Sequence, residues 1–155
     1  MDRILVGLDA SPRAEDVLGT AVELARRTGG KLILFRAVGV PHEIPVEAYT
    51  MTPASLAEML QREALEYLDR IASALPAEMV LETVVSVGTP WQGICAAADH
   101  HQAALIVIGS HGYSGIDKLI GTTAGKVVNH AHQSVLVVRG HPGFTPKRPR
   151  AICAR

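Results

Sequence analysis

The sequence predicts an α/β protein with an open, doubly wound sheet of five parallel strands and helices on both faces. Short, unbroken apolar runs, such as residues 4–8, 104–108 and 135–138, are typical of strands that are buried on both faces. Between these runs lie longer segments whose apolar residues recur every three or four positions, as they do on amphipathic helices. Strands that alternate with helices favour a parallel sheet with helices packed on either side.

Length and composition favour a single folded domain. The chain has 155 residues, of which 48% are hydrophobic and 19% are charged, so a core can form and most of the chain is expected to fold. Fifteen basic and fifteen acidic residues cancel, which argues against a general nucleic-acid or membrane surface. We expect a domain over residues 1–140 and a basic, proline-rich, disordered tail over residues 141–155.

The cysteines and the first residues indicate the compartment. Cys95 falls in an expected helix and Cys153 in the expected tail, so a structural disulfide is not predicted and a reducing interior fits. The first residues lead directly into a strand, and no apolar run approaches the length of about 18 residues that a membrane helix needs. We therefore expect a cytoplasmic protein.

The first half of the chain reads as strand, helix, strand and loop. Residues 4–8 form the first strand, with Asp9 at its carboxyl end. Ser11 and Pro12 have the residue types of a helix N-cap and a first helical position, and Gly29-Gly30 would end that helix. The second strand and a long, aperiodic surface loop follow at residues 31–35 and 39–52.

The second half repeats this alternation. Thr52-Pro53 and Thr89-Pro90 each place a hydroxyl residue before a proline, which predicts two further helix starts. The remaining strands are expected at residues 79–87, 104–108 and 134–139, and the last helix at residues 123–130.

The most informative stretch is the glycine-rich turn after the fourth strand. Gly109-Ser110-His111-Gly112 and then Gly121-Thr122-Thr123 combine glycines, hydroxyls and a helix start, which together could cradle an anion. The alternative is a tight connection that needs glycine for its geometry alone. The spacing fits neither a P-loop nor a Rossmann fingerprint. Because ligands of such sheets bind beyond the carboxyl ends of the strands, Asp9 would share this crevice if the first and fourth strands are neighbours.

These residues resemble a known family. Residues 6–11 (Val-Gly-Leu-Asp-Ala-Ser), the turn at 109–115 and the ending at 130–138 resemble the universal stress protein family, and the match covers nearly all of residues 1–139. The resemblance implies an open sheet of order 3-2-1-4-5, an adenine nucleotide alpha hydrolase-like fold and, usually, a homodimer. One branch of the family binds ATP and another does not.

The ATP-binding branch carries Gly-x-x-Gly, nine further residues, and then Gly with Ser or Thr. Gly109 and Gly112 match the first pair, and Gly121-Thr122 resembles the second. The resemblance implies that Asp9 contacts ribose or Mg²⁺ and that the backbone at the end of the second strand meets adenine. The nucleotide-binding residues implied in this way are Leu8, Asp9 and Ala10, then Ala37 and Val38 for adenine, and finally Gly109, Ser110, His111, Gly112, Gly121, Thr122 and Thr123.

The sequence departs from the family pattern in one place, because eight residues, 113–120, separate the second glycine from the third. The missing residue would shorten the loop or rotate the turn, and so move the donors of Thr122 and Thr123 relative to the phosphates.

Three functions stay open for this chain. They are an ATP-binding regulatory module without rapid turnover, a dimeric interaction protein that binds no nucleotide, and a slow Mg²⁺-dependent ATPase that uses Asp9. No nucleophile–base pair is apparent, so rapid catalysis is not expected.

Several polar residues have a plain structural alternative. Asp9 could cap the first helix, and His111 could be a solvent-facing turn residue. The pairs His100-His101 and His130 with His132 suggest zinc, but no thiolate stands at the spacing of a structural zinc site. Histidines at helix C-terminal ends are favourable near the negative end of the helix dipole, which is the role we expect for them.

The last strand, residues 134–139, would lie at an edge of the sheet. An exposed apolar edge is a liability unless it is covered or paired, and pairing with its own copy across a two-fold axis would resolve this. We therefore predict a homodimer through Ser134 to Arg139, with an adenine nucleotide as ligand and no nucleic-acid or membrane partner.

Overall fold

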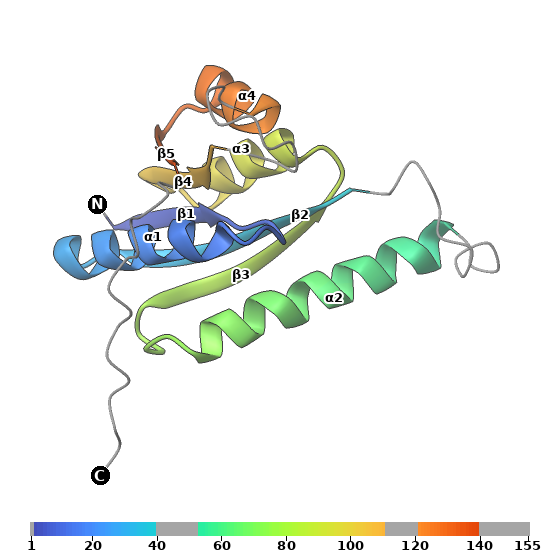
Figure 1. Cartoon of the computed structure of the whole chain (residues 1–155), viewed down its shortest axis with the longest axis horizontal. Helices are drawn as coiled ribbons and strands as arrows, with labels where there is room; N and C mark the ends of the chain where they lie inside the picture. Colours follow the sequence, from blue (N-terminus) through green and yellow to red (C-terminus); the bar gives the residue numbers. More distant parts are fainter. Residues whose placement is uncertain (1, 40–52, 111–120, 140–155) are drawn as a thin grey trace, which may run out of the picture.

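The computed structural model describes residues 2–39, 53–110 and 121–139 as a five-stranded parallel sheet with helices on both faces (Figure 1). The strands follow the order β3-β2-β1-β4-β5, which confirms the predicted class and the order that the resemblance implied. In chain order the elements are β1 (Arg3–Gly7), α1 (Ala14–Thr28), β2 (Lys31–Val38), α2 (Pro53–Ser73), β3 (Val80–Val87), α3 (Pro90–His100), β4 (Leu105–Gly109), α4 (Thr122–His130) and β5 (Ser134–Val138).

β1 lies at the centre of the sheet, between β2 and β4. Its register places Gly7 opposite Phe35 of β2 and next to Ile108 of β4, so the first and fourth strands are neighbours, as the shared crevice requires. The helices that follow β1 and β4 pack on opposite faces of the sheet. Such a divergence is the switch point at which doubly wound sheets bind their ligands.

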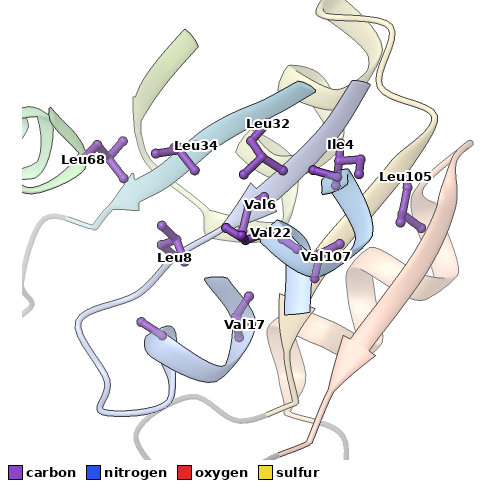
Figure 2. Packing of buried hydrophobic residues seen from close by; sticks show 13 residues of the cluster. Ile4, Val6, Leu8, Val17, Val22, Leu32, Leu34, Leu68, Leu105 and Val107 are labelled. Atoms are coloured by element: carbon purple, nitrogen blue, oxygen red, sulfur yellow. The ribbon is translucent and has the colours of Figure 1, made fainter. Parts of the chain in front are cut away.

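Alternate residues of the strands build two separate cores. Val6 of β1 packs in one cluster with Val17 of α1 and Leu68 of α2, as Figure 2 shows. Leu5, the residue before it, packs in the other cluster with Ile94 of α3 and with residues of α4. Full burial of each such aliphatic side chain stabilises the fold by about 1.5–3 kcal/mol. The sheet is therefore packed between α1 and α2 on one face and α3 and α4 on the other.

The sequence predicts the end of α1 correctly but not its start. Gly29 follows the helix in the left-handed conformation, with φ 70°, that glycine adopts readily. The predicted cap at Ser11 is wrong, because α1 begins at Ala14 with Arg13 at its N-cap position. The hydroxyl of Ser11 donates instead to the carboxylate of Asp9, two residues earlier, which keeps it from the helix.

Other boundaries shift by a few residues. β3 begins at Val80, α4 begins at Thr122, and β2 extends to Val38, beyond the predicted end of that strand. Most of the predicted surface loop and tail, at residues 40–52 and 140–155, lies outside the described residues. In the described ranges, no helix is long and apolar enough to cross a membrane.

Candidate functional site

A cleft of about 720 Å³ opens at the carboxyl ends of β1, β2 and β4. Its walls come from the turn after β1, the end of β2, one side of α2 and the first turns of α3 and α4. The structure thus brings residues between Gly7 and Ala124, which are far apart in the sequence, around one space. Of the predicted binding residues, the lining includes Leu8, Asp9, Ala10, Ala37, Val38, Gly109, Ser110, Gly121 and Thr123.

Among the described residues, one predicted binding residue is not part of this lining. Thr122 begins α4, but its side chain is exposed and stands outside the cleft. His111 and Gly112 lie outside the described residues, together with the rest of the segment 111–120. The roles assigned to those two residues therefore stay predictions.

Asp9 follows β1 and presents a carboxylate to the cleft. Its Oδ1 atom accepts two hydrogen bonds from Ser11, one from the backbone N–H at 3.0 Å and one from the hydroxyl at 2.6 Å. Among the described residues, Oδ2 accepts no hydrogen bond. The carboxylate is therefore oriented by the turn that precedes α1, and one oxygen remains for a hydroxyl donor or a hard cation.

The end of β2 presents unpaired backbone to the same space. The last backbone bond between β1 and β2 among the described residues runs from the N–H of Leu8 to the C=O of Phe35, at 2.8 Å. Residues of a parallel strand direct their backbone groups to alternate neighbours, so Ala37 faces the same side as Phe35, where β1 has already ended. Val38 faces the other way, and its C=O accepts the N–H of Gly88 at 2.9 Å. Ala37 therefore offers one donor and one acceptor to a ligand.

The first turn of α4 supplies further donors. The N–H of Gly121 donates to the C=O of Ser110 at 2.7 Å, which joins the two ends of the segment between β4 and α4. The N–H of Gly125 donates to the C=O of Gly121 at 2.9 Å, and no side chain of the described residues caps the helix. The N–H groups of the first three helical residues consequently lack partners within α4, and they form the positive end of its dipole. Thr123 and Ala124 line the cleft at this point.

Sequence reasoning missed three polar residues from β2 and α2. Arg36 and Glu63 line the cleft. The hydroxyl of Tyr67 donates to the backbone C=O of Asp9 at 3.3 Å, and the Arg36 guanidinium lies 4.5 Å from the centre of the Tyr67 ring. Burial raises the pKa of Tyr67 above its ordinary value of 10.0, while Arg36 acts in the opposite direction. One signal was available, because Arg36 interrupts an apolar strand near its carboxyl end, where ligand-contacting residues are expected.

The chemistry of the cleft favours binding. Its described lining combines unpaired N–H donors, one oriented carboxylate and apolar walls that include Ile94 and Ile108, without histidine, lysine or cysteine. In the part of the chain that the structure describes, no group of three or more His, Cys, Asp or Glu residues could hold a metal ion. His100 and His130 lie in the last turns of α3 and α4.

The strand order and the cleft at the switch point define an adenine nucleotide alpha hydrolase-like fold. The family model described as the universal stress protein family matches residues 1–139. The chain therefore belongs to the universal stress protein family.

Individual relatives agree with this assignment. A universal stress protein of Synechocystis sp. is 29% identical over 149 residues, and the alignment covers 88% of this chain and 97% of that protein. The structure of the universal stress protein UspA from Lactobacillus plantarum matches with a TM-score of 0.70 and 28% identity, over 89% of this chain and 97% of that one. A universal stress protein in complex with cAMP matches with a TM-score of 0.60 and 25% identity, over 89% and 97% of the two chains.

Proposed function

We propose that this universal stress protein binds an adenine nucleotide in the cleft and acts as a regulatory module that holds ATP without rapid turnover. The observation that carries the proposal is the convergence of three kinds of group on one space: the uncapped first turn of α4, the Asp9 carboxylate and the unpaired backbone of Ala37. Each group matches a different part of a nucleotide.

The parts of ATP can be assigned to these groups in order. The phosphates would accept hydrogen bonds from the free N–H groups at the start of α4, whose dipole favours an anion. Asp9 would accept the ribose hydroxyls through its free oxygen. Adenine would pair with the donor and acceptor of Ala37, between apolar side chains such as Ile94 and Val38.

Mg²⁺ fits this arrangement with a limited role for the protein. The ion usually keeps several waters and binds one or two carboxylates together with phosphate oxygens. In a second arrangement, Asp9 Oδ2 would therefore ligate Mg²⁺ instead of accepting the ribose hydroxyls. The described lining holds two carboxylates, Asp9 and Glu63, and no histidine, lysine or cysteine. The slow Mg²⁺-dependent ATPase would therefore have to use a carboxylate such as Asp9 to orient water.

The structure of a relative supports the choice of ligand. The universal stress protein that was solved with cAMP is 25% identical to this chain and covers most of it.

A competing function, that of an interaction protein without nucleotide, is favoured by the loop that is one residue shorter than the family pattern.

The experiment that tests the proposal is identification of the ligand released from purified protein by mass spectrometry, followed by calorimetric titration with Mg-ATP. We expect either a co-purified adenine nucleotide or heat of binding in the titration, and weaker binding in Asp9→Ala. Protein that carries no nucleotide, and that gives no heat up to millimolar Mg-ATP, would instead support the interaction protein.

We also infer a homodimer through β5. This strand lies at an edge of the sheet, and Leu136 on it and Val128 on α4 are 36% and 46% exposed. Pairing of two β5 strands would cover apolar surface and provide hydrogen-bond partners for the backbone N–H and C=O groups at this edge. Light scattering at micromolar concentration should give the mass of two chains, and the mass of one chain would contradict the inference.

A further inference from the structure

Asp9 is contacted by Tyr67 of α2 and by Ser11 of its own turn, and Tyr67 is contacted in turn by Arg36 of β2. The hydroxyl of Tyr67 in α2 donates to the backbone C=O of Asp9 at 3.3 Å, and the Arg36 guanidinium of β2 lies 4.5 Å from the centre of the Tyr67 ring. Ser11 holds the side chain of Asp9, since its N–H and its hydroxyl both donate to Oδ1. The main chain and the side chain of Asp9 are therefore held by different parts of the protein.

The Tyr67 side chain is itself well fixed. Its neighbours on α2, Ala64 and Leu68, are 2% and 0% exposed, so this part of the helix packs closely on the sheet. Tyr67 is half-buried against the core beneath α1 and α2, and a cation over its ring adds an attraction. Burial raises the pKa of its hydroxyl, so this group stays protonated near neutral pH and can donate.

We propose that Tyr67 is a positioning residue, which holds the Asp9 carboxylate where it receives the 2′ and 3′ hydroxyls of the ribose. The inference rests on the proposed function and deepens it by naming the ligand feature that Tyr67 controls. Asp9 lies in a turn after β1, between the strand and α1, where no helix or sheet ladder fixes its backbone. Binding groups need such outside support, because small displacements of the group that contacts the ligand weaken the contact.

The test compares ATP with 2′,3′-dideoxy-ATP by calorimetric titration of the full chain in the presence of Mg²⁺. Because the triphosphate, the base and the metal are the same, the ratio of the two Kd values reports the ribose hydroxyls alone. Wild-type protein should bind ATP about tenfold to a hundredfold more tightly, as expected for hydrogen bonds to a charged group. Tyr67→Phe keeps the ring over which Arg36 lies, and it should reduce this ratio by about threefold to tenfold without weakening the dideoxy nucleotide.

A matched control removes a hydroxyl that is hydrogen-bonded away from the cleft. The Thr83 hydroxyl donates to Asp69 of α2 at 3.1 Å, and neither residue lines the cleft. Thr83→Val should therefore leave the ratio unchanged. Asp9→Ala should abolish the discrimination, and adding Tyr67→Phe to it should change nothing further, because Tyr67 acts through Asp9.

The outcomes separate this inference from the proposed function. If Tyr67→Phe binds ATP with the wild-type ratio, the positioning role is overturned and nucleotide binding stands. The same conclusion follows if the wild-type protein does not discriminate between the two nucleotides, or if Tyr67→Phe lowers the ratio further in the Asp9→Ala background. If the wild-type protein binds neither nucleotide, the proposed function fails and the role of Tyr67 fails with it.

Discussion

Replacement of Gly93 by alanine tests how α3 is held against the sheet beneath the cleft. A Cβ atom at this position would lie 2.3 Å from the Oγ of Ser86 and 3.0 Å from the Cζ of Phe35. Heavy atoms almost never approach so closely, so the helix or these two side chains must move. Ile94, the next residue, is 6% exposed and lines the cleft, and any shift of α3 would displace it as well.

Two opposing effects set the size of the change. Alanine is favoured over glycine within a helix by about 1 kcal/mol, whereas overpacking a core costs about 1–3 kcal/mol. The Ser86 hydroxyl can rotate away, so the cost depends chiefly on the ring of Phe35, whose Cζ would lie 3.0 Å from the new atom. Gly93→Ala should then lower the free energy of unfolding by up to about 2 kcal/mol, and it should not stabilise the protein as Gly19→Ala does. Gly19→Ala in α1 is the matched control, since a Cβ there meets nothing within 4 Å and should stabilise the protein.

Urea unfolding followed by circular dichroism measures both changes, and an unchanged m-value shows that the comparison is valid. The double variant Gly93→Ala with Ser86→Ala should recover part of the loss, because it removes the nearest atom. If Gly93→Ala stabilises the protein as much as Gly19→Ala does, then α3 does not pack closely against Ser86 of β3 and Phe35 of β2, and this account of how α3 is held beneath the cleft is wrong.

Three further predictions concern other parts of the molecule. Val127 of α4 is 0% exposed, so Val127→Ala should lower the free energy of unfolding by about 2 kcal/mol in urea titrations; an unchanged midpoint would mean that α4 is not packed on the sheet. A hydrogen bond from Gln133, and a second from His132, hold the pKa of Asp99 below its ordinary value of 3.8 in the folded protein. The ionised Asp99 carboxylate therefore stabilises the fold above pH 3.8, and this stabilisation is lost as the pH falls through the lowered pKa. The melting temperature of wild-type protein should therefore fall more steeply under acid conditions than that of Asp99→Asn, and parallel curves would refute this. Burial raises the pKa of the Cys95 thiol above 9.0, so iodoacetamide should modify it more slowly than free cysteine at mildly alkaline pH, as followed by peptide mapping; equal rates would count against it.

The fold class could be predicted because the apolar runs in the sequence coincide with the buried strands of the core. The apolar runs around Leu5 and Ile106 correspond to strands that are fully buried between two helical layers, and the glycine at position 29 ends α1 with a positive φ. Burial on both faces leaves no polar alternation in such strands, so the pattern is easy to recognise. The strand order needed the family resemblance, since apolar patterning alone does not say which strands are neighbours.

The parts of the site that could not be predicted depend on contacts with no local signal. The start of α1 was misplaced because Ser11 has two possible partners, a helix N–H and the Asp9 carboxylate, and the nearer carboxylate receives its hydroxyl. Tyr67 lies 58 positions from Asp9, and on α2 its spacing indicates only a partly buried face. Thr122 is exposed at the start of α4 and Thr123 lines the cleft, a difference between adjacent residues that the motif does not indicate. The role assigned to Thr122 stays a prediction.

The central claim is that the first turn of α4 and the end of β2 hold one nucleotide between them. The most direct measurement is a titration of isotope-labelled protein with Mg-ATP, in which NMR follows the amide signal of each residue. We predict the largest shifts at Thr123, Ala124 and Ala37, and none at Leu81 on the far edge strand β3. Signals that do not move at millimolar nucleotide, or that move at Leu81 and not at the first turn of α4, would contradict the claim.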